Sequence, residues 1–208
     1  MIVESEKYLG SVTALLVIED LLFVATGGYV EIYNVYDNNL VHKCKIFNDT
    51  SNIIHGFCQS SQNKNSFLAF GGKTIKSVTI TPTNSIERVQ TYHAKDWLLA
   101  VQWSQDSIWA VSAHNELLRI DDVTSSEVRC QDEKCILYSA CIVDDNNEKI
   151  VIGGTTFRQI IIWGSSTGKI YHRLSGHEGV IFSVNFDEES NTLCSTSDDR
   201  YSFCCYLY

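Results

Sequence analysis

Short apolar segments alternate with polar turns along the whole chain, and the same order of segments recurs five times. Each copy has an apolar strand, a polar turn, a second strand that ends in small residues, a tight turn and an alternating strand. The second strand, tight turn and third strand of the copies occupy residues 21–34, 67–80, 108–122, 150–164 and 192–205. Alternation places successive side chains on opposite faces, so each copy predicts an antiparallel hairpin rather than a helix.

The spacing of the copies is nearly constant. The anchor position of the third strand falls at Tyr33, Thr79, Asp121, Trp163 and Cys205, with steps of 46, 42, 42 and 42 residues. A period of about 40–45 residues with four strands per unit is typical of β-propeller blades. We therefore predict an all-β fold, one incomplete propeller with four full blades and three strands of a fifth. The predicted domain covers residues 1–208, with blades near 12–47, 53–92, 97–130, 136–174 and 180–207.

The turn residues fit this pattern. The pairs expected between the second and third strands are Gly27-Gly28, Gly71-Gly72, His114-Asn115, Gly153-Gly154 and Asp198-Asp199. Tight antiparallel turns often need positive φ angles, which Gly, Asn and Asp tolerate best. Paired glycines also occur in nucleotide-binding loops, but the sequence has no GxGxxG or GxxxxGK[ST] motif, and strands rather than helices follow the glycines.

The charge bears on the class of partner. The net charge is −9, and acids gather in short groups between apolar segments, such as Asp144-Asp145 and Asp187-Glu188-Glu189. We interpret these groups as solvated turns. Phosphate contacts need clustered Lys and Arg, so the balance argues against this segment wrapping nucleic acid alone.

The cysteines and the start of the chain bear on the compartment. The chain has eight cysteines, but residues 1–10 do not form a signal peptide, so we expect a cytoplasmic location with reduced thiols. The longest apolar stretch, residues 12–30, is interrupted by Glu19 and Asp20, so it predicts two strands rather than a membrane helix.

Metal and thiol chemistry have little support in the sequence. The clusters of candidate ligands are His42 with Cys44, and Cys130 with Cys135 and Cys141. No CxxC pair occurs, although zinc sites usually show one. We expect no metal and no cofactor, and we interpret the cysteines within strands as small core residues.

Three tryptophans lie within 13 residues in the third copy: Trp97, Trp103 and Trp109. Aromatic residues can anchor a protein partner. The alternative, packing between neighbouring blades, is the interpretation we favour. Trp97 and Trp103 share a face only if no bulge lies between them.

The most specific stretch, residues 174–200, resembles the WD-repeat family. Gly176-His177 precedes a first strand, and Ser197-Asp198-Asp199-Arg200 forms the expected turn. In that family a His, a strand hydroxyl, a turn Asp and a third-strand Trp form a hydrogen-bonded network inside a blade. The resemblance assigns these roles to His177 and Asp199, with Ser195 or Ser197 as the hydroxyl. Cys205 stands where the Trp is expected, whereas Trp163 fills that position in the fourth blade.

A narrower resemblance points to a role. The segments IIHGF, DWLLAVQW, AHNELLRID, LYSACIV, IVIGGTTFRQIIIW and RLSGHEGVIFSV resemble the amino-terminal part of the WD-repeat subunits that partner a tRNA 2'-O-methyltransferase acting on the anticodon wobble nucleotide. The resemblance implies a non-catalytic scaffold that binds the methyltransferase and helps to present the tRNA. We therefore expect tRNA contacts only through the complex, no membrane or DNA partner, and no catalytic residue. The resemblance assigns no individual partner-binding residue.

The sequence departs from this family at its end. Members of the family are far longer, and the segment YSFCCYLY breaks the expected third strand where the Trp is due. We expect a fragment, an alternative isoform or an incomplete gene model. Two other functions stay open: a general protein-interaction propeller in trafficking or signalling, and an enzyme that uses the His–Asp–Ser set or a cysteine.

Overall fold

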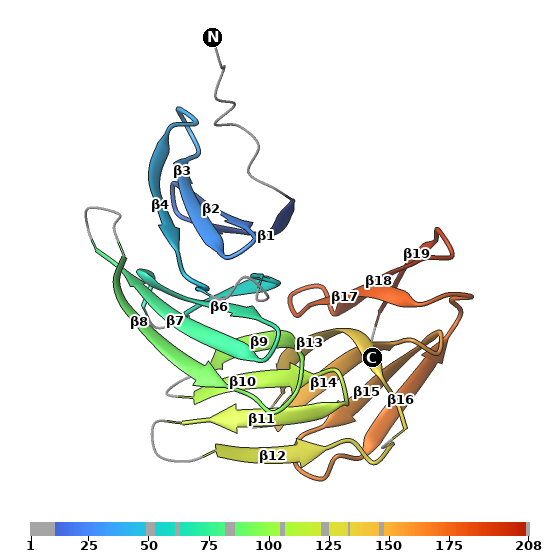
Figure 1. Ribbon diagram of the computed structural model, residues 1–208. Coiled ribbons are helices and arrows are strands. Elements are labelled where there is room, and N and C mark those ends of the chain that lie inside the picture. The colour runs from blue at the N-terminus through green and yellow to red at the C-terminus, as the bar shows by residue number, and fades with distance from the viewer. Residues whose placement is uncertain are drawn as a thin grey trace. The chain divides into compact units, whose positions relative to one another are not determined.

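The computed structural model contains only strands and connecting turns among the residues it describes (Figure 1). These residues are 11–48, 53–60, 63–81, 86–104, 107–121, 125–132, 134–145 and 148–206. The chain divides into two compact units, residues 1–94 and 95–208.

The first unit holds two antiparallel sheets of four strands, each in simple sequential order. The strands of the first sheet are β1 (Val12–Ile18), β2 (Leu21–Thr26), β3 (Tyr29–Asn34) and β4 (Leu40–Lys45). Those of the second sheet are β5 (Gly56–Gln59), β6 (Ser66–Gly71), β7 (Thr74–Ile80) and β8 (Ile86–His93). Their first strands, β1 and β5, contact each other, and the rings of Phe23 and Phe67 pack across the junction with centroids 5.1 Å apart.

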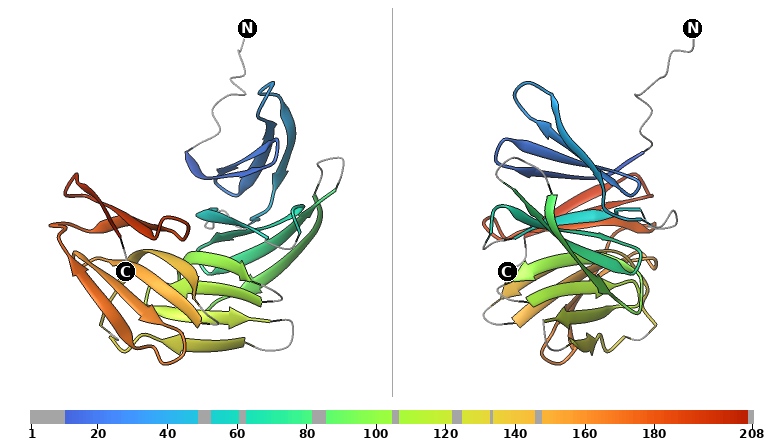
Figure 2. Two further views of the ribbon diagram at one scale, coloured as in Figure 1. Left: turned by 180° about the vertical axis from the view of Figure 1, so that it is seen from behind. Right: turned by 60° about the vertical axis from the view of Figure 1, so that its left-hand side comes forward.

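The second unit holds two further four-stranded sheets and one three-stranded sheet, which Figure 2 shows from two more directions. The third sheet comprises β9 (Leu98–Ser104), β10 (Ser107–Ser112), β11 (Glu116–Ile120) and β12 (Ser125–Arg129). The fourth comprises β13 (Leu137–Asp145), β14 (Glu148–Thr155), β15 (Gln159–Gly164) and β16 (Ile170–Ser175). The fifth comprises β17 (Ile181–Asp187), β18 (Thr192–Ser197) and β19 (Ser202–Tyr206). Strand β13 contacts both β9 and β17, so first strands of successive sheets are neighbours.

The expected organisation of the strands is therefore present among the described residues: four sheets of four strands and one of three. Apolar residues of each sheet meet those of the next sheet in the same unit. The cluster that includes Val143, Ile152, Ile162, Ile181 and Leu193 joins the fourth and fifth sheets. The fourth sheet lies between the third and the fifth, which explains why β15 is apolar on both faces: Ile161 and Trp163 pack towards the third sheet, and Ile160 and Ile162 pack towards the fifth.

One turn prediction is wrong. Gly153 and Gly154 lie inside β14, and the turn to β15 follows them, with Arg158 at a φ of 70°. The glycines are needed for packing rather than for a turn, because a Cβ atom at Gly153 would lie 2.6 Å from the Leu137 side chain, and one at Gly154 would lie 2.5 Å from Ser139 Oγ. Gly27, Gly72 and Asn115 do occupy turns with positive φ angles.

Candidate functional site

The connection between β16 and β17 places His177 against the turn that joins β18 to β19. His177 Nδ1 lies 2.9 Å from Asp199 Oδ2, and His177 Nε2 lies 2.9 Å from Ser195 Oγ. Of the two candidate hydroxyls, Ser195 is the one that contacts the ring. The Ser197 hydroxyl instead accepts the Asp199 backbone N–H at 3.3 Å.

Asp199 fixes the orientation of this network. Burial by itself raises the pKa of the Asp199 carboxyl, but hydrogen bonds from the backbone N–H groups of Tyr201 and Glu178 and from His177 outweigh it and lower the pKa to about 2. The carboxylate is therefore ionised at neutral pH and only accepts hydrogen bonds, so His177 Nδ1 donates to it. In the neutral imidazole, Nε2 then accepts the hydroxyl hydrogen of Ser195.

The two tryptophan positions differ from the family pattern. Cys205 is exposed on β19, and the His177 ring packs against Phe203, with ring centroids 4.6 Å apart. Trp163 is fully buried, and its Nε1 donates to Asn115 Oδ1 at 2.8 Å, across from the fourth sheet to the turn of the third. Sequence reasoning missed Phe203 and Asn115, because both contacts depend on how separate strands meet.

The hydrogen bonds that link Ser195 to His177 and His177 to Asp199 occur in the same order as those of a catalytic nucleophile, its base and an orienting carboxylate. A cavity of about 340 Å³ touches both His177 and Ser195, and its other walls include the apolar side chains of Ile160 and Leu174. Ser195 is 3% exposed, so its hydroxyl is directed into the network rather than to solvent. The network ties the loop before β17 to the β18–β19 turn, because Asp199 also accepts the N–H groups of Glu178 and Tyr201, each at 2.8 Å.

The loops and the adjoining strand ends at this end of the second unit display large apolar side chains. We call the following set the loop face: Trp97, Ile136, Tyr138, Phe157, Phe182 and Tyr201. Each is at least 42% exposed, and Phe157 and Tyr201 reach 63% and 65%. Exposed apolar side chains that gather on one face are typical of protein-interaction surfaces, in which aromatic residues carry much of the binding energy.

The members of the loop face come from three successive sheets that are linked at this end. The rings of Tyr138 on β13 and Phe182 on β17 pack together with centroids 5.2 Å apart. The backbone N–H of Thr156, next to Phe157, donates to the Ile136 carbonyl at 3.1 Å. The loop of Trp97 is held by the Asp96 carboxylate, which accepts the backbone N–H of His114 at 3.1 Å.

The three tryptophans singled out in the sequence do not share one surface. Trp97 precedes β9 and is exposed, whereas Trp103 and Trp109 are partly buried within the third sheet. The register between β9 and β10 shifts near Ser112, which pairs with Leu98, so a bulge separates Trp97 from the regular alternation. The interpretation as blade packing fits Trp109, which joins the core between the third and fourth sheets, but not Trp97.

Within the described ranges, no group of three or more His, Cys, Asp or Glu side chains is arranged to hold a metal ion. None of the eight cysteines, all of which lie in the described ranges, forms a disulfide, and burial raises the pKa of the Cys141 thiol to about 12. The part of the chain that the structure describes also contains no helix that could cross a membrane.

Comparison with known proteins supports the repeat and the fold. The WD domain, G-beta repeat family matches residues 168–201, the stretch that contains the His177 network. The crystal structure of the Cps50 (Swd1) β-propeller domain from Myceliophteria thermophila superimposes with a TM-score of 0.75 at 13% identity, covering 96% of this chain and 66% of that one. This likeness confirms the predicted β-propeller fold.

Relatives in sequence identify a narrower group of proteins than the repeat and the fold do. The chain is 28% identical over 94% of its length to the mouse tRNA (34-2'-O)-methyltransferase regulator WDR6, and 26% identical over 71% of its length to the protein of that name in Drosophila melanogaster. It spans about 19% and 18% of the length of these two relatives. The chain therefore carries a WD-repeat match over residues 168–201 and has a β-propeller fold, and over nearly its whole length it is similar to the tRNA (34-2'-O)-methyltransferase regulators.

Proposed function

We propose that the chain is a non-catalytic scaffold that binds a tRNA 2'-O-methyltransferase and supports methylation of the anticodon wobble nucleotide. The observation that carries the proposal is the similarity, over 94% of the chain, to a protein named as a regulator of that methyltransferase. In this proposal the enzyme subunit performs the methyl transfer, and the propeller holds the enzyme and its substrate together in the cytoplasm.

The loop face supports a protein partner. Trp97, Phe157 and Tyr201 project from connections between strands, while the strands themselves form the rigid support. Replacing an aromatic hot-spot residue at the centre of an interface by Ala often costs about 2 kcal/mol or more, which corresponds to about a thirtyfold change in affinity. We propose that the loop face contacts the methyltransferase.

The charge supports an indirect role in tRNA binding. The net charge of −9 opposes close approach of a phosphate backbone, so contacts to tRNA in this proposal come through the complex, and neither DNA nor a membrane is a partner.

The proposal is tested by wobble methylation and binding together. Cells that lack the gene are complemented with the wild-type gene or with Trp97→Ala/Tyr201→Ala. We expect the double variant to recover much less methyltransferase in affinity purification and to restore less 2'-O-methylation of the wobble nucleotide. Tyr36→Ala, at a residue 79% exposed in the first unit, is the matched control and should behave as wild type.

Two alternative functions give different results. A general interaction propeller would leave wobble methylation unchanged after deletion and would recover trafficking or signalling proteins. An enzyme that uses the connectivity of Ser195, His177 and Asp199 would lose turnover in His177→Ala while folding normally. The structural role predicts the reverse: loss of stability, with no turnover of its own to lose.

A further inference from the structure

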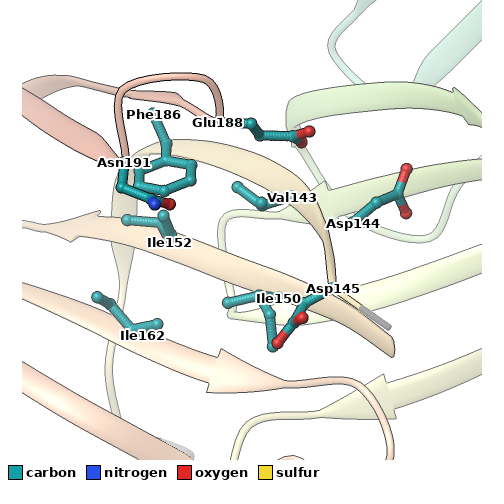
Figure 3. Close-up of a pocket in the computed structure, with 9 residues that line it drawn as sticks. All are labelled: Val143, Asp144, Asp145, Ile150, Ile152, Ile162, Phe186, Glu188 and Asn191. Atoms are coloured by element: carbon teal, nitrogen blue, oxygen red, sulfur yellow. The ribbon is translucent and has the colours of Figure 1, made fainter. Parts of the chain in front are cut away.

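A crevice lies between the fourth and fifth sheets, at the end of the strands opposite to the loop face. The β13–β14 and β17–β18 hairpins enclose a crevice of about 360 Å³, which we call the acidic crevice (Figure 3). Its floor consists of the apolar side chains of Val143, Ile150, Ile152, Ile162 and Phe186. These residues belong to or pack on the core between the two sheets, so the floor is rigid.

The rim of the acidic crevice is polar and negatively charged. Asp144 and Asp145 come from the end of β13, and Glu188 and Asn191 come from the turn after β17 (Figure 3). Asp144 already pairs with Lys149 and accepts a hydrogen bond from Gln102 at 3.2 Å, on the side of the third sheet. Glu188 is exposed, and no ion pair joins it to another residue of the described chain.

The first unit has a crevice at the corresponding place, between the β1–β2 and β5–β6 hairpins, where Glu19 and Asp20 come from one side and the basic Lys64 comes from the other. Ile18 and Leu21 occupy its floor as Val143 and Ile150 do in the acidic crevice. Across its mouth, Lys64 Nζ lies 3.2 Å from Glu19 Oε1. The turn that supplies Lys64 in the first unit supplies Glu188 in the acidic crevice, so both sides of the second mouth are acidic.

We propose that the acidic crevice binds a segment of a partner protein in which an Arg or Lys side chain lies beside an apolar side chain. The basic group supplies the charge that Lys64 supplies in the first unit, and the apolar side chain covers Ile150, Ile152 and Phe186. The volume is in the range of sites that hold small ligands, which suits one or two side chains rather than a helix. Acidic rims repel phosphate, so this is not a nucleic-acid surface.

This inference does not depend on the identity of the partner at the loop face. Glu188 follows β17 whereas the loop with His177 precedes it, so the two surfaces lie at opposite ends of that strand. Failure of the acidic crevice to bind a basic segment would leave the proposed function intact, and loss of methyltransferase binding would leave the crevice intact.

The test uses the full 208-residue chain with labelled isoleucine methyl groups and a defined peptide, acetyl-Leu-Arg-Leu-amide. We expect NMR shift changes at Ile150, Ile152 and Ile162 on titration, and none at Ile32 or Ile46 in the first unit. The peptide with citrulline in place of arginine keeps the shape and removes the charge. It should bind about two- to fivefold more weakly, as expected for a partly solvated ion pair.

Variants separate the charge from the fold. Glu188→Lys and Glu188→Gln should both weaken binding of the arginine peptide, the lysine variant more strongly, while the methyl spectrum without peptide stays close to that of the wild type. Glu178→Lys, at the other end of β17, is the matched control and should bind as wild type. Equal binding of the arginine and citrulline peptides, shifts scattered over both units, or no shift up to about 10 mM peptide would overturn the proposal.

Discussion

His177→Ala tests the structural role of the network most sharply. The substitution removes a ring whose two nitrogens each make a 2.9 Å hydrogen bond, and it uncovers one side of Phe203. The Ser195 hydroxyl stays buried without its acceptor, whereas Asp199 keeps the N–H groups of Glu178 and Tyr201. Leaving a buried polar group unpaired costs about 1–3 kcal/mol, so we expect a loss of that size in the free energy of unfolding.

The assay is thermal and urea unfolding followed by circular dichroism. For a chain of this length, about 1 kcal/mol corresponds to a shift in Tm of roughly 2–4 °C. His172→Ala, at an exposed histidine on β16 of the same unit, is the control and should change stability by less than about 0.5 kcal/mol. If His177→Ala were as stable as this control, the assignment of His177 to a structural network would be refuted.

Three further predictions concern other groups. Folding lowers the pKa of Asp199 from its ordinary value of 3.8 to about 2, so its contribution to stability is present above about pH 4 and is lost as the pH falls towards 2. This acid-dependent loss, measured by urea titrations at several pH values, should be smaller in Asp199→Asn. Burial raises the pKa of the Cys141 thiol to about 12, so a thiol reagent at pH 8 should modify the exposed Cys205 well before Cys141. Peptide mass spectrometry measures the two rates, and equal rates would contradict the burial of Cys141. Trp163→Phe keeps an aromatic ring but leaves Asn115 Oδ1 without its donor, so it should lower the free energy of unfolding by about 1–3 kcal/mol. An unchanged denaturation midpoint would argue against that hydrogen bond.

The repeat could be predicted from the sequence because its signals are local. Alternating apolar residues, turn residues and a period of 42 residues specify hairpins, and each of the five predicted hairpins is present. The error at Gly153-Gly154 has a physical cause. Glycine serves both tight turns and close packing, and only the positions of Leu137 and Ser139 show which of these roles applies.

The functional surfaces could be predicted only in part. The positions of His177 and Asp199 follow from a motif, and the structure brings them together with Ser195. The loop face and the acidic crevice join residues from different sheets, so no local pattern marks them. The sequence also does not specify the bulge near Ser112, which separates Trp97 from the regular alternation of β9.

The central claim is that this chain acts through a partner in wobble methylation. The most direct measurement is the 2'-O-methylation of the wobble nucleotide in tRNA from cells that lack the gene, quantified by mass spectrometry of tRNA digests. The account predicts a marked loss that the wild-type gene restores and the loop-face variant Trp97→Ala/Tyr201→Ala does not. Unchanged methylation in the deletion strain would contradict it.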